Sequence, residues 1–213
     1  HVPLLEENPH EAFQVNVEGT RIICETAIRY NIDKLILISS DKCNDPTGVM
    51  SISRCLSEMV VINLSRKQEV STKFIITRFG NVLGSGGSVV PLFTQQISEG
   101  GPVTVTHPEM SRYFMTIPEA CELILEAGCI GQGGEIYLFD MGDPVKITDM
   151  AEKMIRLSGL EPGKDIEIVF TGLRPGEKLK DGQQDKNIIS VPTQNARIRL
   201  LQVEEIDYPG LIT

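Results

Sequence analysis

Two hydrophobic patterns alternate along the chain, one typical of strands and the other typical of helices. Continuous apolar runs predict strands covered on both faces, because such strands are apolar at nearly every position. These runs lie at 34–39, 73–79, 102–107, 135–142 and 165–172. Apolar residues at spacings of three and four predict helices. The helices cover 10–30, a segment around 52–60, a segment ending near 99, 116–127 and 147–159.

The same spacing predicts which side of each helix is buried. The stripe of the first helix contains Phe13, Val17, Ile22 and Ala27. The stripe of the second contains Ile52, Cys55, Leu56, Met59 and Val60. The helix over 116–127 begins with a capping box, Thr116 and Glu119, and has Pro118 in its first turn.

Strands that alternate with helices predict βαβ units, and hence an α/β fold with a mostly parallel sheet. The alternation weakens after about residue 180. The stretch 180–187 is polar and loop-like, and 196–203 is compatible with one late strand. We therefore expect one large α/β domain with a smaller lobe at its C-terminal side.

Composition narrows the class of protein. A net charge of -9 argues against general binding to nucleic acid or to anionic membrane. Five scattered cysteines without a C-x-x-C pair argue against zinc and a disulfide framework, and favour a reducing, cytoplasmic location. No apolar run reaches about 18 residues, so we expect no membrane span in this segment. The chain begins without methionine, which leaves room for an upstream segment, including a membrane anchor.

Candidate chemistry gathers where predicted strands end. In open α/β sheets ligands bind at the carboxyl ends of the strands. Four polar or glycine-rich stretches follow strands here, and we expect them to share one cleft. They are "SSDK" (39–42), "GNVLGSGGS" (80–88), "MGDP" (141–144) and "GLRPGEK" (172–178).

Each of these features has two interpretations when it is taken alone. Asp41 and Lys42 can serve as proton donor and acceptor in a cleft, or form an exposed pair that caps a turn. The "GSGGS" stretch suits a phosphate, or is a flexible turn before a helix; it fits neither G-x-G-x-x-G nor a Walker loop. Arg78, Arg112 and Arg174 are candidate forks for phosphate or carboxylate, or surface ion pairs. The histidines show no metal-ligand spacing.

Five motifs together are more specific. The stretches "NVEGT", "LISSDK" with "PTGVM", "RFGNVLGSGGSVVPLF", "SRYFMTIPEA" and "GLRPGEKL" occur in this order. They closely resemble the nucleotide-sugar 4,6-dehydratases of capsule, O-antigen and flagellar-glycan biosynthesis, a branch of the extended short-chain dehydrogenase/reductases. The resemblance covers about residues 1–180. It implies a partial Rossmann-like fold, with a Rossmann-like part over 1–100 and a nucleotide-sugar-binding lobe over 101–213.

The resemblance also implies a reaction. In such enzymes the C4 hydride of a UDP-sugar, typically UDP-N-acetylglucosamine, passes to tightly held NAD or NADP. The C5 proton is then removed, water leaves C6, and the hydride returns to C6. By position, Asp41 would be the acid for the departing hydroxyl and Lys42 the base at C5. Ser40 would lie near the C4 oxygen, and Met50 occupies the position of the family's usual tyrosine.

The resemblance assigns the remaining site residues. Ser39, Arg54 and Phe79 would contact the cofactor, with Arg54 standing where the family has a lysine. The residues that would bind the nucleotide sugar are Asn81, Ser88, Val89, Thr104, Thr106, Arg112, Arg174 and Glu177.

Two alternatives to the dehydratase stay open at this point. One is a UDP-sugar epimerase of the same branch, and the other is a catalytically degraded sugar-nucleotide-binding module. The family's first strand and its G-x-x-G-x-x-G turn do not occur in the chain, so we expect this segment by itself to be inactive. We also expect a homodimer or larger oligomer.

Overall fold

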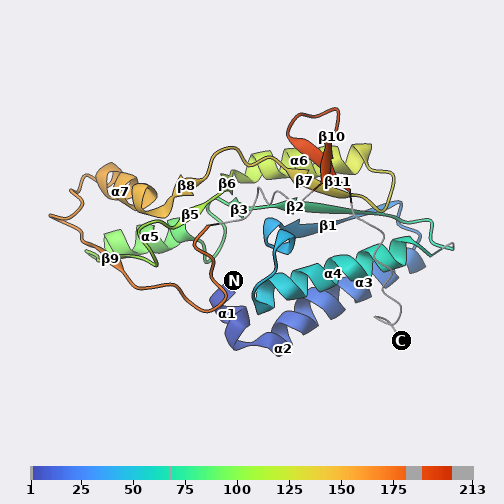
Figure 1. Ribbon diagram of the computed structural model, residues 1–213, viewed down its shortest axis with the longest axis horizontal. Coiled ribbons are helices and arrows are strands. Elements are labelled where there is room, and N and C mark those ends of the chain that lie inside the picture. Colours follow the sequence, from blue (N-terminus) through green and yellow to red (C-terminus); the bar gives the residue numbers. More distant parts are fainter. Residues whose placement is uncertain (1, 68, 181–188, 203–213) are drawn as a thin grey trace.

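The computed structural model describes residues 2–67, 69–180 and 189–202 (Figure 1). Each predicted helix is present within these residues, and the helix over 10–30 contains a π-helical segment, Phe13–Glu18. A 3₁₀ turn, Asp41–Asn44, follows the first strand. The α-helices are α1 (Val2–Glu7), α2 (Pro9–Ala12), α3 (Gly19–Arg29), α4 (Val49–Ser65), α5 (Val89–Ser98), α6 (Ile117–Ile130) and α7 (Ile147–Leu157).

The main sheet has five strands in the order β1-β2-β7-β11-β10. Its β1, β2 and β7 are parallel, whereas β11 and β10 are antiparallel to their neighbours. The mostly parallel α/β sheet predicted for the chain is therefore confirmed. Its strands are β1 (Lys34–Ser40), β2 (Lys73–Phe79), β7 (Ile136–Phe139), β10 (Ser190–Pro192) and β11 (Ile198–Leu201).

Three two-stranded pairs lie beside this sheet: β3 with β6, β4 with β9, and β5 with β8. The predicted strands at 102–107 and 165–172 are present as β4 (Val103–Val105) and β9 (Ile168–Phe170). The other four strands have two residues each, too few to show a hydrophobic period, and sequence analysis did not predict them. They are β3 (Asn81–Val82), β5 (Ser111–Arg112), β6 (Phe114–Met115) and β8 (Val145–Lys146).

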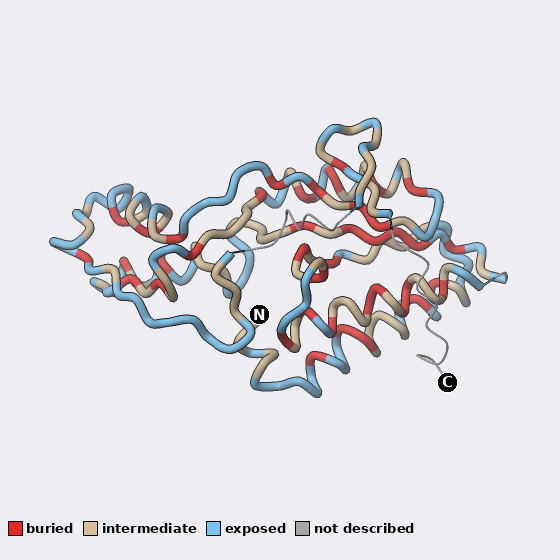
Figure 2. Tube along the Cα trace, viewed as in Figure 1, coloured by how far each residue is buried: buried red, intermediate tan, exposed pale blue. Residues whose placement is uncertain are grey.

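The interior strand β2 shows why the sheet is stable. Phe74 and Ile76 pack on one face with α4 residues, and Ile75 packs on the other face with α6 residues. All three side chains are almost fully buried, which explains the continuous apolar run in this part of the sequence. The trace of the main sheet is largely in the colour of buried residues (Figure 2). Complete burial of each such side chain contributes about 1.5–3 kcal/mol. Side chains alternate between the two faces of a strand, so the residues of β2 after Ile76 continue to point to alternate faces of the sheet.

The buried faces of the π-helical segment Phe13–Glu18 and of α4 differ from the predicted stripes. Ile52 is 48% exposed and Phe13 is 43% exposed, although both were predicted to be buried. Small polar residues take the buried positions instead; Asn16, for example, donates to the Ser53 hydroxyl at 2.9 Å. Small side chains allow the two segments to approach closely, and the buried polar groups are hydrogen-bonded, Asn16 across to α4 and Ser57 to the Ser53 carbonyl within α4.

A second, smaller core lies at the other end of the molecule (Figure 1). It is formed by α5 and α7 with β4 and β9, and contains Phe93, Val105, Ile155 and Ile166. Between them in the sequence, α6 and β7 return to the main sheet. The chain thus passes from the sheet to the small lobe and back. No helix among the described residues is long and apolar enough to cross a membrane.

Candidate active site

A cavity of about 470 Å³ lies where the main sheet meets the small lobe. Three of the four strand-end stretches line it: 39–42, 80–88 and 172–178. The prediction of one shared cleft fails for the fourth, 141–144. There the Asp140 carboxylate accepts a hydrogen bond from the Gly142 amide at 2.9 Å, and Met141 is buried in the core of the sheet. The stretch 141–144 therefore follows β7 in a local turn and does not line the cavity.

The Asp41–Lys42 pair lies on the 3₁₀ turn directly after β1. Lys42 lines the cavity, and its Nζ atom is 3.6 Å from Oδ1 of Asp41. The Asp41 carboxylate is almost fully buried behind it and accepts a hydrogen bond from the Ser40 hydroxyl at 3.2 Å. The Ser40 oxygen also accepts from the Lys42 amide at 3.3 Å. The turn therefore presents the amine to the cavity and holds the carboxylate beneath it.

Gly80 makes room for this carboxylate. It follows β2, and a Cβ atom added there would lie 3.0 Å from Oδ2 of Asp41 and 3.3 Å from the Met141 methyl group. Real Cβ atoms rarely approach a neighbour so closely. The glycine is required here for close approach of the backbone.

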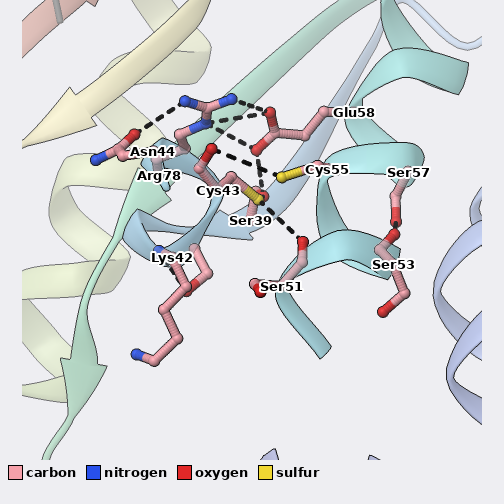
Figure 3. A network of polar contacts seen from close by, with 11 residues as sticks. Ser39, Lys42, Cys43, Asn44, Ser51, Ser53, Cys55, Ser57, Glu58 and Arg78 are labelled. Carbon is pink, nitrogen blue, oxygen red and sulfur yellow. Dashed lines mark hydrogen bonds and ion pairs between the residues drawn. The ribbon is translucent and has the colours of Figure 1, made fainter. Parts of the chain in front are cut away.

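A buried polar network lies behind the turn (Figure 3). Arg78 Nε donates to both carboxylate oxygens of Glu58, at 2.9 and 3.1 Å, and the Ser39 hydroxyl donates to the same carboxylate. Arg78 Nη1 donates to Oδ1 of Asn44 at 2.9 Å. Burial alone would lower the pKa of Arg78, but the hydrogen bonds and charge of Glu58 raise it above its ordinary value. Arg78 is therefore a partner of Glu58, not a phosphate fork in the cavity.

Two cysteines border this network (Figure 3). The Cys43 sulfur is 3.5 Å from the Ser39 hydroxyl, and the Cys55 thiol donates to the Cys43 carbonyl at 3.6 Å. Interaction with the Cys55 side chain, together with burial, raises the pKa of Cys43. Interaction with the Cys43 side chain lowers the pKa of Cys55, so Cys55 is the more readily ionised of the two.

The start of α4 packs beside the turn and also lines the cavity. Met50 and Arg54 line the cavity, and Arg54 Nη1 donates to the Ile38 carbonyl at 3.4 Å. The Ser51 hydroxyl accepts from the Gly48 amide at 3.1 Å and stabilises the first turn of the helix. The cavity lining does not include Phe79, a predicted cofactor contact, which is buried and stacks on Phe139 with ring centroids 5.4 Å apart.

The glycine-rich loop runs along the cavity from β3 to α5. Asn81, Ser88 and Val89 all line it. Ser88 is the N-cap of α5, and among the described residues its buried hydroxyl has no hydrogen-bond partner. The backbone amides at this helix start carry partial positive charge, which favours an anion.

The small lobe contributes Thr104 and Thr106 to the lining. Gln96 on α5 holds Thr104 twice: its amide nitrogen donates to the Thr104 hydroxyl at 2.7 Å, and its oxygen accepts from the Thr104 amide at 3.0 Å. The Thr104 hydroxyl is therefore oriented before any ligand arrives.

Two arginines, Arg112 and Arg174, line the cavity, and backbone carbonyls hold Arg112 in position. Arg112 donates to the Lys178 carbonyl at 2.6 Å and to the Leu179 carbonyl at 3.2 Å. Glu177 lies between the two arginines, with a carboxylate oxygen 3.9 Å from Arg112 and 3.5 Å from Arg174. Arg112, Arg174 and Glu177, all predicted from the sequence, thus meet in the wall of the cavity.

Helix α1 packs against the loop of Arg174 and Glu177 and also lines the cavity through Val2 and Pro3. Gly176 has a φ of +72°, and an added Cβ atom would lie 2.6 Å from the Glu6 carboxyl group. Glycine is therefore required on two grounds, its left-handed backbone and the close contact. The turn that carries Arg174 and Glu177 is in this way packed against the N-terminal helix.

Sequence analysis missed two residues that shape the site, Glu58 and Gln96. For Glu58 a signal existed, because an acid between Leu56 and Met59 interrupts an apolar helical stripe. Gln96 gave no signal. Lys178, in the predicted stretch 172–178, lines the cavity and also pairs with Asp45, a contact between residues far apart in the sequence.

Known proteins similar to this chain were found by sequence and by structure. Residues 1–199 match the family model described as "Polysaccharide biosynthesis protein". The capsular polysaccharide biosynthesis protein CapD of Staphylococcus aureus is 53% identical over 189 residues, which are 89% of this chain and 31% of CapD. The probable polysaccharide biosynthesis protein EpsC of Bacillus subtilis is 46% identical over 212 residues, or 100% of this chain and 35% of EpsC.

A solved structure is also similar. The X-ray structure of Pen from Bacillus thuringiensis superposes with a TM-score of 0.85 at 33% identity, covering 94% of this chain and 62% of Pen. The chain thus spans about a third of the length of the two curated relatives.

Proposed function

Because the chain belongs to the polysaccharide biosynthesis protein family, we propose that its cavity binds a UDP-sugar in a 4,6-dehydratase. The whole protein would convert a UDP-N-acetylhexosamine into its 4-keto-6-deoxy derivative for capsule, O-antigen or related glycans. The observation that carries this proposal is one cavity lined by Lys42, which pairs with Asp41, and by Arg112 and Arg174. Acid–base chemistry and diphosphate binding would thus be served by separate segments around the same cavity.

Asp41 and Lys42 would divide the elimination between them. Lys42 lines the cavity, so its amine can reach a proton on a bound sugar carbon and act as the base at C5. The Asp41 carboxyl group, 3.6 Å behind it, would give a proton to the departing C6 hydroxyl. Ser40 donates to Asp41 and would orient both the carboxyl group and the C4 oxygen.

The residues near β1 fit the nicotinamide end of NAD or NADP. Dinucleotides bind at the carboxyl ends of strands in such sheets, and Ser40, Met50 and Arg54 line the cavity there. When bound, the dinucleotide would supply oxidation and reduction at C4 and C6 of the sugar. Arg54, anchored on the Ile38 carbonyl, would hold the adjacent ribose with its remaining donors.

The part of the cavity wall that carries Arg112 and Arg174 suits the diphosphate. The amides at the start of α5 and the guanidinium groups of Arg112 and Arg174 offer donors from separate elements. Ser88, whose hydroxyl has no partner among the described residues, adds a donor at the same helix start. Thr104, oriented by Gln96, and Thr106 would then lie along the uridine.

The test is turnover by the whole natural protein that contains this chain. We would incubate it with UDP-N-acetylglucosamine and NAD⁺ and follow the sugar nucleotide by mass spectrometry. A 4,6-dehydratase removes one water, and Lys42→Ala should abolish that product. Lys146→Ala is the matched control, because Lys146 is an exposed lysine outside the cavity.

The other candidate functions give different results when the products are also separated by chromatography and binding is measured by calorimetry. An isomer of unchanged mass that elutes apart from the substrate would identify an epimerase. Binding of the UDP-sugar without turnover would identify a binding module. Either result would contradict the dehydratase proposal.

A further inference from the structure

Glu58 and Arg78 form an ion pair, and neither residue is among those that line the cavity. Glu58 is 2% exposed, and the Arg78 side chain is 12% exposed. Burial of two charges carries a desolvation penalty. Replacement of such a pair by apolar side chains of similar volume is often neutral or stabilising. The stability of the core alone therefore does not explain why this ion pair is present.

Strand geometry brings the pair behind the Asp41–Lys42 turn. In β1, Leu37 packs toward α4, so Ser39, two residues later, points the same way. In β2, Ile76 packs toward α4, so Arg78 does as well. The parallel register sets Ser39 beside Arg78. Glu58, from α4, meets both (Figure 3).

The ion pair contacts both ends of the turn. Before its first residue, the Ser39 hydroxyl donates to the Glu58 carboxylate. At its last residue, the Asn44 carboxamide oxygen accepts from Arg78 Nη1 at 2.9 Å. Arg78 Nε bonds to both oxygens of Glu58 and so joins the two contacts. The turn is thereby clamped between a strand and a helix.

We propose that Glu58 and Arg78 are positioning residues that hold Asp41 and Lys42 in place against the bound sugar. The inference rests on the proposed dehydratase function. A general acid and a general base act only within hydrogen-bond reach of their protons, and a displacement of about 1 Å can cost about 100-fold in rate. A buried, bidentate ion pair is stiff enough to prevent such a displacement.

The test uses the double variant Glu58→Leu/Arg78→Met of the whole natural protein. It removes both charges together, so neither remains buried without its partner. The matched control is Glu152→Leu/Arg156→Met. That pair is also an ion pair, at 2.9 Å, but it lies exposed on α7 and outside the cavity.

We expect kcat of the double variant to fall by about 100-fold, with KM for UDP-N-acetylglucosamine and the melting temperature close to wild type. Amide hydrogen exchange of residues 40–45, measured by mass spectrometry, should become faster, while exchange in α6 stays unchanged. The control should match the wild type in all four measurements. A purely structural role would instead move the melting temperature together with kcat.

Wild-type kcat in the double variant, or unchanged exchange of residues 40–45, would overturn the proposal. If the double variant loses its thermal stability, the test of the positioning role passes to Asn44→Ala. This substitution releases one end of the turn and leaves the ion pair intact. Slower turnover with faster exchange then supports the proposal, and wild-type values overturn it. A wild-type protein without dehydratase activity would contradict the proposed function alone, and exchange of residues 40–45 would still report whether the ion pair holds the turn.

Discussion

Two parts of the cavity wall are built differently, and we name them by their residues: the reaction end carries Asp41 and Lys42, and the nucleotide end carries Arg112 and Arg174. At the end near β1, Asp41 and Lys42 sit on a short turn whose flanks are tied to a buried ion pair. At the other end, Arg112 is held mainly by backbone carbonyls, and Arg174 is half exposed. One end is restrained by charged side chains from a strand and a helix, and the other by a loop folded over an arginine.

This difference matches what each end would have to do. Proton transfer requires placement within hydrogen-bond reach, so the reaction end benefits from a stiff support. Binding of a diphosphate needs charge and donors, which long side chains can supply from a less rigid loop. Substitutions at the reaction end should therefore affect kcat, and those at the nucleotide end should affect KM. Four predictions test this division in the whole natural protein.

The largest effect is expected from Asp41→Asn. The amide keeps the shape of the carboxyl group but cannot give up a proton as an acid, so kcat should fall by about 10³-fold. Binding of the UDP-sugar, measured by calorimetry, should stay close to wild type. Asp143→Asn, on an exposed loop outside the cavity, is the control. A variant that keeps most of its kcat would exclude Asp41 as the acid.

Arg112→Gln should affect the nucleotide end alone. Loss of a charged donor to the diphosphate should raise KM by roughly 10- to 100-fold, with kcat little changed. Steady-state kinetics with UDP-N-acetylglucosamine measure both constants. If kcat falls while KM is unchanged, the division between the two ends is wrong.

Gly80→Ala sharpens the comparison, because it crowds the reaction end without removing a functional group. The new Cβ atom would lie 3.0 Å from Oδ2 of Asp41, so the carboxylate must shift, and kcat should fall by about tenfold. Gly19→Ala is the matched control: its nearest neighbour would be at an ordinary 3.7 Å, and it lies on α3. Equal kcat values for the two variants would show that Asp41 tolerates the crowding.

The smallest effect is expected outside both ends, at the start of α6. The Thr116 hydroxyl accepts from the Glu119 amide at 3.3 Å, so Thr116→Ala should lower the melting temperature by about 2–4 °C without changing kcat or KM. Hydrogen bonds from Thr116 lower the pKa of Glu119 below its ordinary value. This contribution is present at neutral pH and is lost as the pH falls through the lowered pKa. The difference between variant and wild type, measured by thermal unfolding, should therefore shrink in acid.

The sequence predicted the elements of the main sheet well where their pattern was long. The apolar runs at 34–39 and 73–79 became β1 and β2, and the capping box of Thr116 and Glu119 begins α6 as expected. Strands of two residues were missed, because they exist only through pairing with another segment. Ile52 was assigned to the wrong face, since α4 buries small polar residues against its neighbour.

The candidate site was predicted in part. Lys42, Arg54, Arg112 and Arg174 line one cavity, although they come from separate segments of the chain. The stretch 141–144 was wrongly included, because a local turn directs it away from that cavity. The catalytic and binding roles of the lining residues stay predictions until the variants above are measured.

The sequence by itself determined the type of each long element and the order of polar stretches at strand ends, because both depend on neighbours within a few residues. Only the tertiary structure decided which charges meet. Ser39, Glu58 and Arg78 come together through the register of β1 on β2 and the packing of α4 across them. That contact depends on strand parity and helix rotation at once, and a change of one residue in either would point Arg78 away from Glu58.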